Sequence, residues 1–320
     1  MIIVTGAAGF IGSCLVKRLN EEGIGPVIAV DDFSNPEKNL NLENKNIFQQ
    51  TDRFDFINKL KQFEKIDFVF HIGARTDTSE FDTTLLDSLN TDYSIKLWNY
   101  CTEQQIPMIY ASSAATYGMG ELGFEDNHRI IPRLKPLNPY GRSKQMFDEF
   151  VLKQSNTPPF WAGLKFFNVF GPNEYHKGRM ASMVLHGTHQ ILKSNTIKLF
   201  RSHNNNYGDG EQVRDFIYVM DVLEVIMYLY RERPESAIYN LGTGNASSWN
   251  QLAGAIFKAL NKDVQIEYID IPKDIRSTYQ YFTEAKMGKL INTGYKKPFT
   301  SLENAVKDYV NGYIINKKYF

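Results

Sequence analysis

Short, nearly continuous apolar runs alternate with helical patterns through the first half of the chain. Apolar strands without alternation are buried on both faces, which is typical of a parallel sheet covered by helices on both sides. The pattern therefore predicts a doubly wound α/β domain, with a parallel, Rossmann-like sheet. The predicted strands are residues 2–4, 26–31, 68–72 and 108–112.

Helical spacing separates these strands. An apolar stripe of Ile11, Leu15 and Leu19 predicts a first helix over residues 10–20. A four-residue repeat between the third and fourth strands predicts an amphipathic helix. Its members are Leu85, Leu89, Tyr93, Leu97 and Cys101.

The second half of the chain is less regular. A helix over 140–153 and a strand over 160–166 are predicted, whereas residues 202–213 have little periodicity and are expected to form an exposed loop. The run 300–303 (TSLE) has the capping-box spacing that opens a terminal helix. Because no Pro- or Gly-rich linker marks a boundary, we expect a second, smaller α/β domain interleaved with the first.

A glycine-rich turn joins the first predicted strand to the first helix. Gly6, Gly9 and Gly12 have G-x-x-G-x-x-G spacing, which permits a tight turn and leaves the helix N-terminus open to a pyrophosphate. Glycines also punctuate ordinary loops, but here the strand–turn–helix context is present. Asp31 ends the second strand, where a ribose hydroxyl is held in such sites. Together these features predict dinucleotide binding.

The sequence leaves the choice between NAD and NADP open. Asp31 and Asp32 would repel a 2′-phosphate and favour NAD. Lys38 and Arg53 follow in the next loop and strand, and cations there would favour NADP. Each of these residues is equally compatible with a solvated surface charge.

A tyrosine and a lysine lie four residues apart in the predicted helix over 140–153. Tyr140 and Lys144 therefore share one helix face. A free tyrosine, with a pKa of about 10, is a poor base near neutrality, whereas a nearby ammonium and a cationic nicotinamide ring stabilise the phenolate. Ser113 ends a serine-rich strand and can hydrogen-bond the substrate oxygen that Tyr140 deprotonates, although a strand-end serine can also serve as a cap.

Composition narrows the class of protein. The chain has 320 residues with 36 basic and 36 acidic side chains, so its formal charge of zero argues against a broadly basic nucleic-acid or membrane binder. Its two cysteines are too few for a disulfide framework, and its six histidines form no metal-ligand cluster. Without an apolar run of about 20 residues or a signal-peptide pattern, we expect an intracellular, cytoplasmic protein.

The glycine loop, Ser113, Tyr140 and Lys144 resemble the extended short-chain dehydrogenase/reductase superfamily, whose members act on nucleotide sugars. Further segments narrow the resemblance to the ADP-L-glycero-D-manno-heptose 6-epimerases and cover essentially the whole chain. The H-K-G-x-M-A-S segment is the most specific of them. The segments are 111–118 (ASSAATYG), 167–172 (FNVFGP), 176–182 (HKGRMAS), 214–219 (RDFIYV), 240–244 (NLGTG) and 279–283 (YQYFT).

The resemblance implies epimerisation at C6 of the heptose in an ADP-sugar, with a tightly held NADP that is regenerated in each turnover. The C6 hydrogen is not acidic, so inversion needs oxidation to a carbonyl, rotation about C5–C6 and hydride return to the opposite face. Two carbonyl orientations need two acid/base groups, which the resemblance assigns to Tyr140 and Lys177. Sequence spacing alone would make Lys177 a solvated surface ammonium. A lysine acts as a base only where its surroundings lower its pKa.

The resemblance also implies contacts residue by residue and two interleaved domains. The dinucleotide-binding domain spans 1–168 plus 214–240, and the substrate domain spans 169–213 plus 241–320. Expected cofactor contacts are Gly6, Gly9, Phe10, Ile11, Gly12, Asp31, Asp32, Lys38, Arg53, Ile72, Gly73, Ala74, Arg75, Thr76, Asn90, Lys144 and Lys177. Expected ADP-heptose contacts are Ser113, Asn168, Arg179, His186, Phe200, Arg201, Ser202, His203, Arg214 and Tyr279.

Arg214 suits a diphosphate because a guanidinium pairs bidentately with phosphate oxygens, although it can instead pair with the adjacent Asp215. Arg179 stands where the family has a small residue, and the loop over 202–213 is longer than the family's. The resemblance further implies a homo-oligomer, a pentamer, and a role in supplying heptose for the lipopolysaccharide inner core.

Three alternatives remain at this point. A UDP-hexose 4-epimerase and a nucleotide-sugar dehydratase share the scaffold. A dehydratase usually has an acid pair beside the strand-end serine, and Ala114 and Ala115 stand there instead. A non-catalytic cofactor-binding protein is the third alternative, and the intact set of Ser113, Tyr140 and Lys144 argues against it.

Overall fold

A seven-stranded parallel sheet forms the centre of the computed structural model, which describes residues 1–63, 65–78, 80–276 and 278–320. The strand order is β11-β6-β5-β4-β1-β2-β3, and every neighbouring pair is parallel. The predicted fold class is confirmed. The strands are β1 (Ile2–Thr5), β2 (Val27–Asp31), β3 (Gln49–Asp52), β4 (Phe68–His71), β5 (Met108–Ser113), β6 (Trp161–Phe166) and β11 (Ala237–Leu241).

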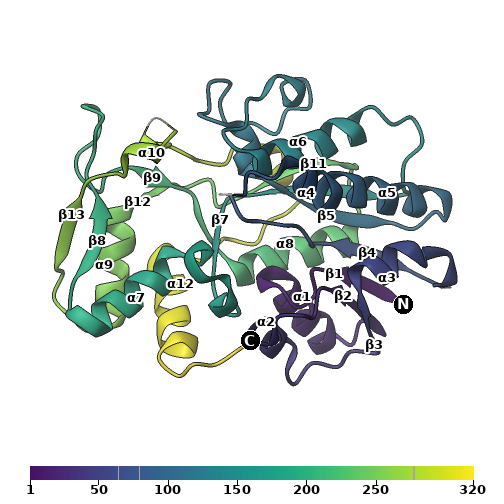
Figure 1. Ribbon diagram of the computed structural model, residues 1–320, viewed down its shortest axis with the longest axis horizontal. Helices are drawn as coiled ribbons and strands as arrows, with labels where there is room; N and C mark the ends of the chain where they lie inside the picture. Colours follow the sequence, from purple (N-terminus) through teal and green to yellow (C-terminus); the bar gives the residue numbers. More distant parts are fainter. Residues whose placement is uncertain (64, 79, 277) are drawn as a thin grey trace.

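Helices cover both faces of this sheet. In Figure 1, α4, α5 and α6 lie on one side of the sheet, and α1 and α8 lie on the other. This double cover explains why the strands read as continuous apolar runs. The bounds are α1 (Phe10–Glu21), α2 (Pro36–Asn39), α3 (Arg53–Asn58), α4 (Thr83–Leu86), α5 (Tyr93–Glu103), α6 (Pro139–Leu152) and α8 (Val219–Glu232).

Three two-stranded pairs complete the strand topology. In Figure 1, β8, β13 and α9 lie together at the end of the molecule away from β1 to β5. The pairs are β7 (Asn168–Phe170) with β10 (Phe216–Tyr218), β9 (Val213–Arg214) with β12 (Ser247–Ser248), and β8 (Ile197–Phe200) with β13 (Ile266–Ile269). The remaining helices are α7 (Met183–Ser194), α9 (Trp249–Ala259), α10 (Lys273–Arg276), α11 (Gly288–Asn292) and α12 (Leu302–Asp308).

Two local predictions need correction. The capping box was expected at Thr300, but Ser301 caps α12 by accepting from the Asn304 N–H, while Thr300 hydrogen-bonds Asp221. The four-residue apolar repeat does form a helix, yet residues Asp87–Asp92 wind as a π-helix between α4 and α5. A strict four-residue repeat drifts around an α-helix, and the wider π turn offsets that drift.

The strand order reverses between β1 and β4, and ligands bind at such switch points in α/β sheets. The loops after these two strands touch there, because a Cβ on Gly6 would lie 2.6 Å from the Cα of Gly73. Gly6 also has a φ of +68°, which favours glycine. Residues without a Cβ therefore bring both loops to one crevice.

Gly12→Ala tests the close packing of α1 on the glycine turn, because the added Cβ would lie 2.0 Å from the carbonyl oxygen of Gly6. We expect the free energy of unfolding to fall by about 2 kcal/mol, as in overpacked cores, with loss of dinucleotide affinity. Denaturant unfolding and cofactor titration measure the two effects. Gly254→Ala in α9 is the control, since nothing lies within 4 Å of its added Cβ. An equal loss in both variants would contradict the prediction.

Candidate active site

A cleft of about 590 Å³ opens at the carboxyl ends of the central strands. It takes in the glycine loop, the ends of β2, β4 and β5, the start of α6 and the segment carrying Lys177. Of the expected cofactor contacts, all but Asn90 line this cleft, as do Ser113 and Tyr140. Residues from 6 to 177 in the sequence therefore meet in one cavity.

The glycine loop fits a pyrophosphate. Gly9 is the N-cap of α1 and offers no side-chain cap, and the first turn of α1 carries no acidic residue. The N–H groups of a helix's first turn lack intrahelical partners and attract anions. Asp31 steadies the loop, since its carboxylate accepts from the Ala8 N–H at 2.8 Å.

Two cations stand beside two carboxylates at the β2 edge of the cleft. The Lys38 ammonium pairs with Asp31, which also accepts from the Asp32 N–H at 2.7 Å. Arg53 pairs with Asp32 at 3.2 Å. Hydrogen bonds from Ser34 lower the pKa of Asp32, and the two cations lower it further. The four charges therefore compensate one another.

The loop after β4 is held from behind. His71 lies between the hydroxyls of Thr5 and Ser94, at 2.7 and 2.8 Å, and Thr5 accepts from the Gly73 N–H at 3.2 Å. Asn90 was expected to touch the cofactor. It is instead buried behind the loop, where its side chain accepts from the Arg75 N–H and donates to the Arg75 carbonyl.

Helix α6 carries the tyrosine and the lysine into the cleft. Asn138 caps it by accepting from the Gly141 N–H at 2.8 Å, and Pro139 opens its first turn. Lys144 donates to the Ala111 carbonyl of β5 at 2.9 Å. These contacts fix the face of α6 that carries Tyr140 against the end of β5.

Burial acts on the two side chains in opposite directions. It raises the pKa of Tyr140, while a hydrogen bond with Ser113 works to lower it. Burial lowers the pKa of Lys144 to about 8, and the Asp148 carboxylate opposes this shift. The Lys144 ammonium therefore becomes the stronger acid of the two, and burial favours the neutral Tyr140 phenol.

Lys177 is a partly buried cleft residue, so the alternative of a solvated surface ammonium is wrong. Its ammonium lies 5.1 Å from the ring centroid of Phe10. Burial lowers its pKa, and the carboxylate of Glu174 works against that shift. Glu174 is itself buried and bonds Ser182 through both oxygens, which closes the turn that carries Lys177.

The expected substrate contacts divide into several groups. Phe200, Arg214 and Tyr279 come together: the Arg214 guanidinium lies 5.3 Å from the Tyr279 centroid, and the rings of Phe200 and Tyr279 are 5.8 Å apart. The alternative pair of Arg214 with Asp215 is wrong, because Arg214 donates to carbonyls of Val213 and Gln280. The Asp215 carboxylate instead accepts from Thr243, Gly244 and Ala285.

The other expected substrate residues are more dispersed. Arg179 is 68% exposed and pairs with Asp77 at 3.1 Å on the cleft rim. Arg201, Ser202 and His203 lie in the loop between β8 and β9, so the predicted loop over 202–213 is confirmed except at Val213, which begins β9. His186 lies on α7, and Asn168 is exposed on β7.

Sequence reasoning missed an aromatic group around Arg214. Trp249 lies 5.7 Å from the Arg214 guanidinium, and Tyr281 stacks near both Tyr279 and Tyr207. The segment that carries Tyr279 also reaches the turn after β5, since Gln280 donates to the carbonyl of Gly118. Because the chain has many tyrosines, its sequence does not indicate which of them lie together in the fold.

The comparisons with known proteins identify the family. The model of the NAD dependent epimerase/dehydratase family matches residues 2–242. An ADP-L-glycero-D-manno-heptose-6-epimerase from Fusobacterium nucleatum is 46% identical over 325 residues, covering 98% of each chain. The chain belongs to the ADP-L-glycero-D-manno-heptose-6-epimerase family. The family match supports a nicotinamide cofactor for this chain.

Solved structures agree on the fold. The Helicobacter pylori ADP-L-glycero-D-manno-heptose-6-epimerase is 28% identical, with a TM-score of 0.81, over 97% of this chain and 95% of its own. A UDP-N-acetylglucosamine 4-epimerase from Methanobrevibacter ruminantium has the same TM-score at 26% identity, over 99% and 98%. The backbone alone therefore does not separate 6-epimerases from 4-epimerases.

The described residues contain neither a metal-ligand cluster nor a membrane-spanning helix. Within residues 1–63, 65–78, 80–276 and 278–320, no group of three or more His, Cys, Asp or Glu side chains is placed to hold a metal ion. No helix in this part of the chain has the length and apolar character needed to cross a membrane.

His71→Gln tests the role of the buried His71 behind the loop that follows β4. Burial lowers the pKa of His71 from 6.5 to about 3, so below pH 6.5 the unfolded chain binds a proton that the folded chain does not. The wild-type free energy of unfolding therefore falls as the pH is lowered. His71 accounts for about 1.5 kcal/mol of that loss between pH 6.5 and about pH 5.

Denaturant unfolding at the two pH values measures the slope. We expect His71→Gln to lose less stability than the wild type between them. His203→Gln is the control, because His203 is exposed on the loop after β8. An unchanged slope in His71→Gln would contradict the assignment.

Proposed function

We propose that this protein is an ADP-heptose 6-epimerase that interconverts ADP-D-glycero-β-D-manno-heptose and ADP-L-glycero-β-D-manno-heptose. The observation that carries the proposal is the 46% identity to a 6-epimerase over 98% of both chains. The geometry supports it, since Ser113, Tyr140 and Lys177 line one cleft. The product would supply heptose for the lipopolysaccharide inner core in the cytoplasm.

The reaction must break and remake a C–H bond that is not acidic. Oxidation of C6 to a ketone, rotation about C5–C6 and reduction from the other face invert the centre without a net redox change. The nicotinamide coenzyme, when bound, accepts the C6 hydride and later returns it. The chain's own residues must then remove the hydroxyl proton and restore it in two carbonyl orientations.

Tyr140 is the first proton-transfer group in this proposal. Ser113 supplies the second hydrogen bond to the C6 oxygen, and its Oγ already lies within reach of the tyrosine hydroxyl. Burial alone keeps the phenol neutral, so the positive charge of Lys144 is needed to stabilise the phenolate. Proton transfer to a positioned side chain typically accelerates a reaction by about 10²–10⁴-fold.

Lys177 is the second proton-transfer group. Its lowered pKa allows a neutral amine to accept a proton, and Phe10 limits its contact with water. Tyr140 comes from α6 and Lys177 from the 174–182 segment, so Lys177 would meet the carbonyl in its rotated orientation. Glu174 keeps this turn closed.

We further propose NADP as the coenzyme. The carboxylate of Asp31 is already engaged by the Ala8 and Asp32 N–H groups and by Lys38. Lys38 and Arg53 therefore bring two cations to the adenosine end of the cleft, where a 2′-phosphate sits in NADP-binding relatives of this fold. Their pairing with Asp31 and Asp32 holds both side chains in place.

The ADP moiety would occupy the group around Arg214. This guanidinium is only 7% exposed and is flanked by the rings of Trp249 and Tyr279, so it is a fixed cation. Such a cation suits a diphosphate, and the rings suit an adenine. We also propose that residues 169–213 plus 241–320 form the substrate domain and residues 1–168 plus 214–240 the dinucleotide domain, with Arg214 at the boundary between them. We also propose a homo-oligomer.

Tyr140→Phe and Lys177→Met test the two proton-transfer roles. Incubation with ADP-D-glycero-β-D-manno-heptose, followed by chromatographic resolution of the two epimers, should show losses of about 10²–10⁴-fold in each variant. Lys59→Met, an exposed pair with Asp55, should keep the wild-type rate. A wild-type protein that converts UDP-galactose and not the ADP-sugar would refute the proposed function. A wild-type rate in either active-site variant would refute that role.

Lys38→Met tests the coenzyme assignment. We expect the Kd for NADP to rise about 10–100-fold, because a hydrogen bond to a charged group is worth about 1.5–3 kcal/mol, while NAD affinity changes little. Fluorescence titration of both dinucleotides measures this. The cofactor released by heat should be NADP by mass spectrometry. Equal loss of NAD and NADP affinity would contradict the assignment.

A further inference from the structure

A fully buried ion pair lies directly beneath the face of α6 that carries Tyr140 and Lys144. Asp148 and Lys165 are both 0% exposed, and the Lys165 ammonium is 2.6 Å from the Asp148 carboxylate. Asp148 follows Lys144 by four residues, so Tyr140, Lys144 and Asp148 occupy one stripe of the helix. Neither Asp148 nor Lys165 lines the cleft.

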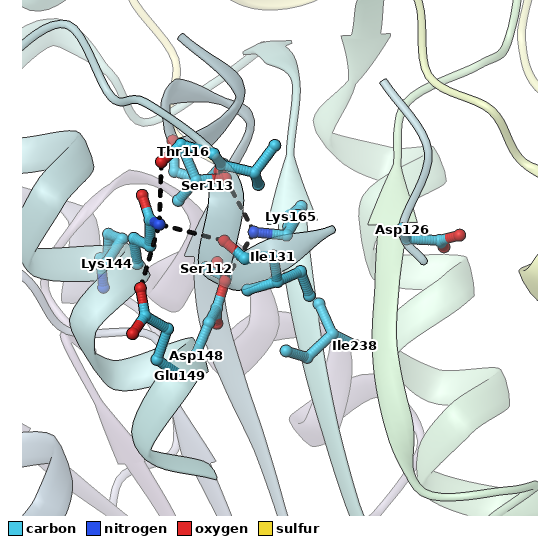
Figure 2. A network of polar contacts seen from close by, with 12 residues as sticks. Ser112, Ser113, Thr116, Asp126, Ile131, Lys144, Asp148, Glu149, Lys165 and Ile238 are labelled. Atoms are coloured by element: carbon cyan, nitrogen blue, oxygen red, sulfur yellow. Dashed lines mark hydrogen bonds and ion pairs between the residues drawn. The ribbon is translucent and has the colours of Figure 1, made fainter. Parts of the chain in front are cut away.

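The pair connects α6 to two strands. Asp148 accepts from the Ser112 hydroxyl at 2.7 Å and from the Tyr110 hydroxyl at 3.1 Å, both on β5. Lys165 lies on β6, in register with Ser112. Figure 2 shows Lys165 and Asp148 converging beside Ser112, with Lys144 on the neighbouring turn of the helix.

The same pair reaches the turn that follows Ser113. Lys165 also donates to the Thr116 hydroxyl at 2.7 Å, and Thr116 donates to the Ser113 carbonyl at 2.8 Å. The side chain of Ser113 is oriented by this turn, because it accepts from the Ala115 N–H at 3.1 Å. One network therefore holds both the strand end with Ser113 and the helix with Tyr140.

We propose that the buried Asp148–Lys165 pair is a positioning device of the active site, which fixes α6 on β5 and stabilises the ammonium form of Lys144. This inference rests on the proposed function only for the reaction used in one of its assays. Its physical basis is the low polarity of the site, where a charge acts more strongly than it does in water.

The charges around Lys144 give the effect a sign. Its own helix contributes Asp148 and Tyr140, and β4 contributes the neutral His71. The Tyr110 hydroxyl on β5 and the Lys165 ammonium on β6 both contact the Asp148 carboxylate. Asp148 is the single anion in this set. Removal of its charge therefore favours the neutral amine of Lys144, and removal of the Lys165 charge favours the ammonium.

Two variants of the holoenzyme, Asp148→Asn and Lys165→Met, test the proposal. Asp148→Asn should move the basic limb of the kcat/KM profile about one pH unit lower. Lys165→Met removes the ammonium, which lies 5.3 Å from the centroid of the Tyr117 ring, and should move the limb in the opposite direction. A loss of stability alone would lower the amount of active enzyme in both variants. It would not shift the basic limb in opposite directions in the two variants.

Asp126→Asn is the matched control. Asp126 is another buried carboxylate with a lysine partner, Lys289 at 3.8 Å, and Figure 2 shows it apart from the Asp148 network. Its substitution should leave the basic limb in place. If Asp148→Asn does not fold, the upward shift in Lys165→Met decides the question.

A second readout does not depend on the substrate. The pH dependence of Lys144 acylation by a small amine reagent, followed by mass spectrometry, reports the protonation of that amine directly. Its midpoint should fall in Asp148→Asn and rise in Lys165→Met. If the wild type converts no ADP-heptose, the proposed function fails while these midpoints still decide this inference. Unchanged midpoints in both folded variants would overturn it.

Discussion

The contact between the loops after β1 and β4 is the constraint on which the site depends. Gly6 and Gly73 approach so closely that neither loop has room for a side chain at the point of contact. That contact places the N-terminus of α1 at the switch point of the sheet, and His71 and Thr5 hold the second loop from behind. Residues from distant parts of the chain then line one cleft.

Burial without water gives the site its acid–base character. Desolvation raises the pKa of the phenol of Tyr140 and lowers the pKa of the ammonium groups of Lys144 and Lys177. Charges placed close by then adjust each group: Asp148 acts on Lys144, and Glu174 acts on Lys177. The two carboxylates lie on different elements, so the two sides of the site can be tuned separately.

Local patterns in the sequence were sufficient for the central sheet and for most of the residues that line the cleft. The continuous apolar strands and the Gly6–Gly12 spacing are short-range features with direct physical meaning. Side-chain groups built from distant segments could not be predicted from the sequence. The environment of Lys177 depends on Phe10, and the surroundings of Arg214 depend on Trp249, which no local pattern joins. The capping prediction at Thr300 was wrong because the Thr300 hydroxyl donates to Asp221, which lies 79 residues away in the sequence.

The account's central claim is that C6 is inverted by removal and return of the same hydrogen. Turnover of ADP-D-glycero-β-D-manno-heptose carrying deuterium at C6, in ordinary water, tests it most directly by mass spectrometry and NMR. We predict that the L-glycero product keeps its deuterium at C6, because the proposed reaction returns to C6 the same hydride that it removes. Replacement of that deuterium by solvent hydrogen would contradict the account.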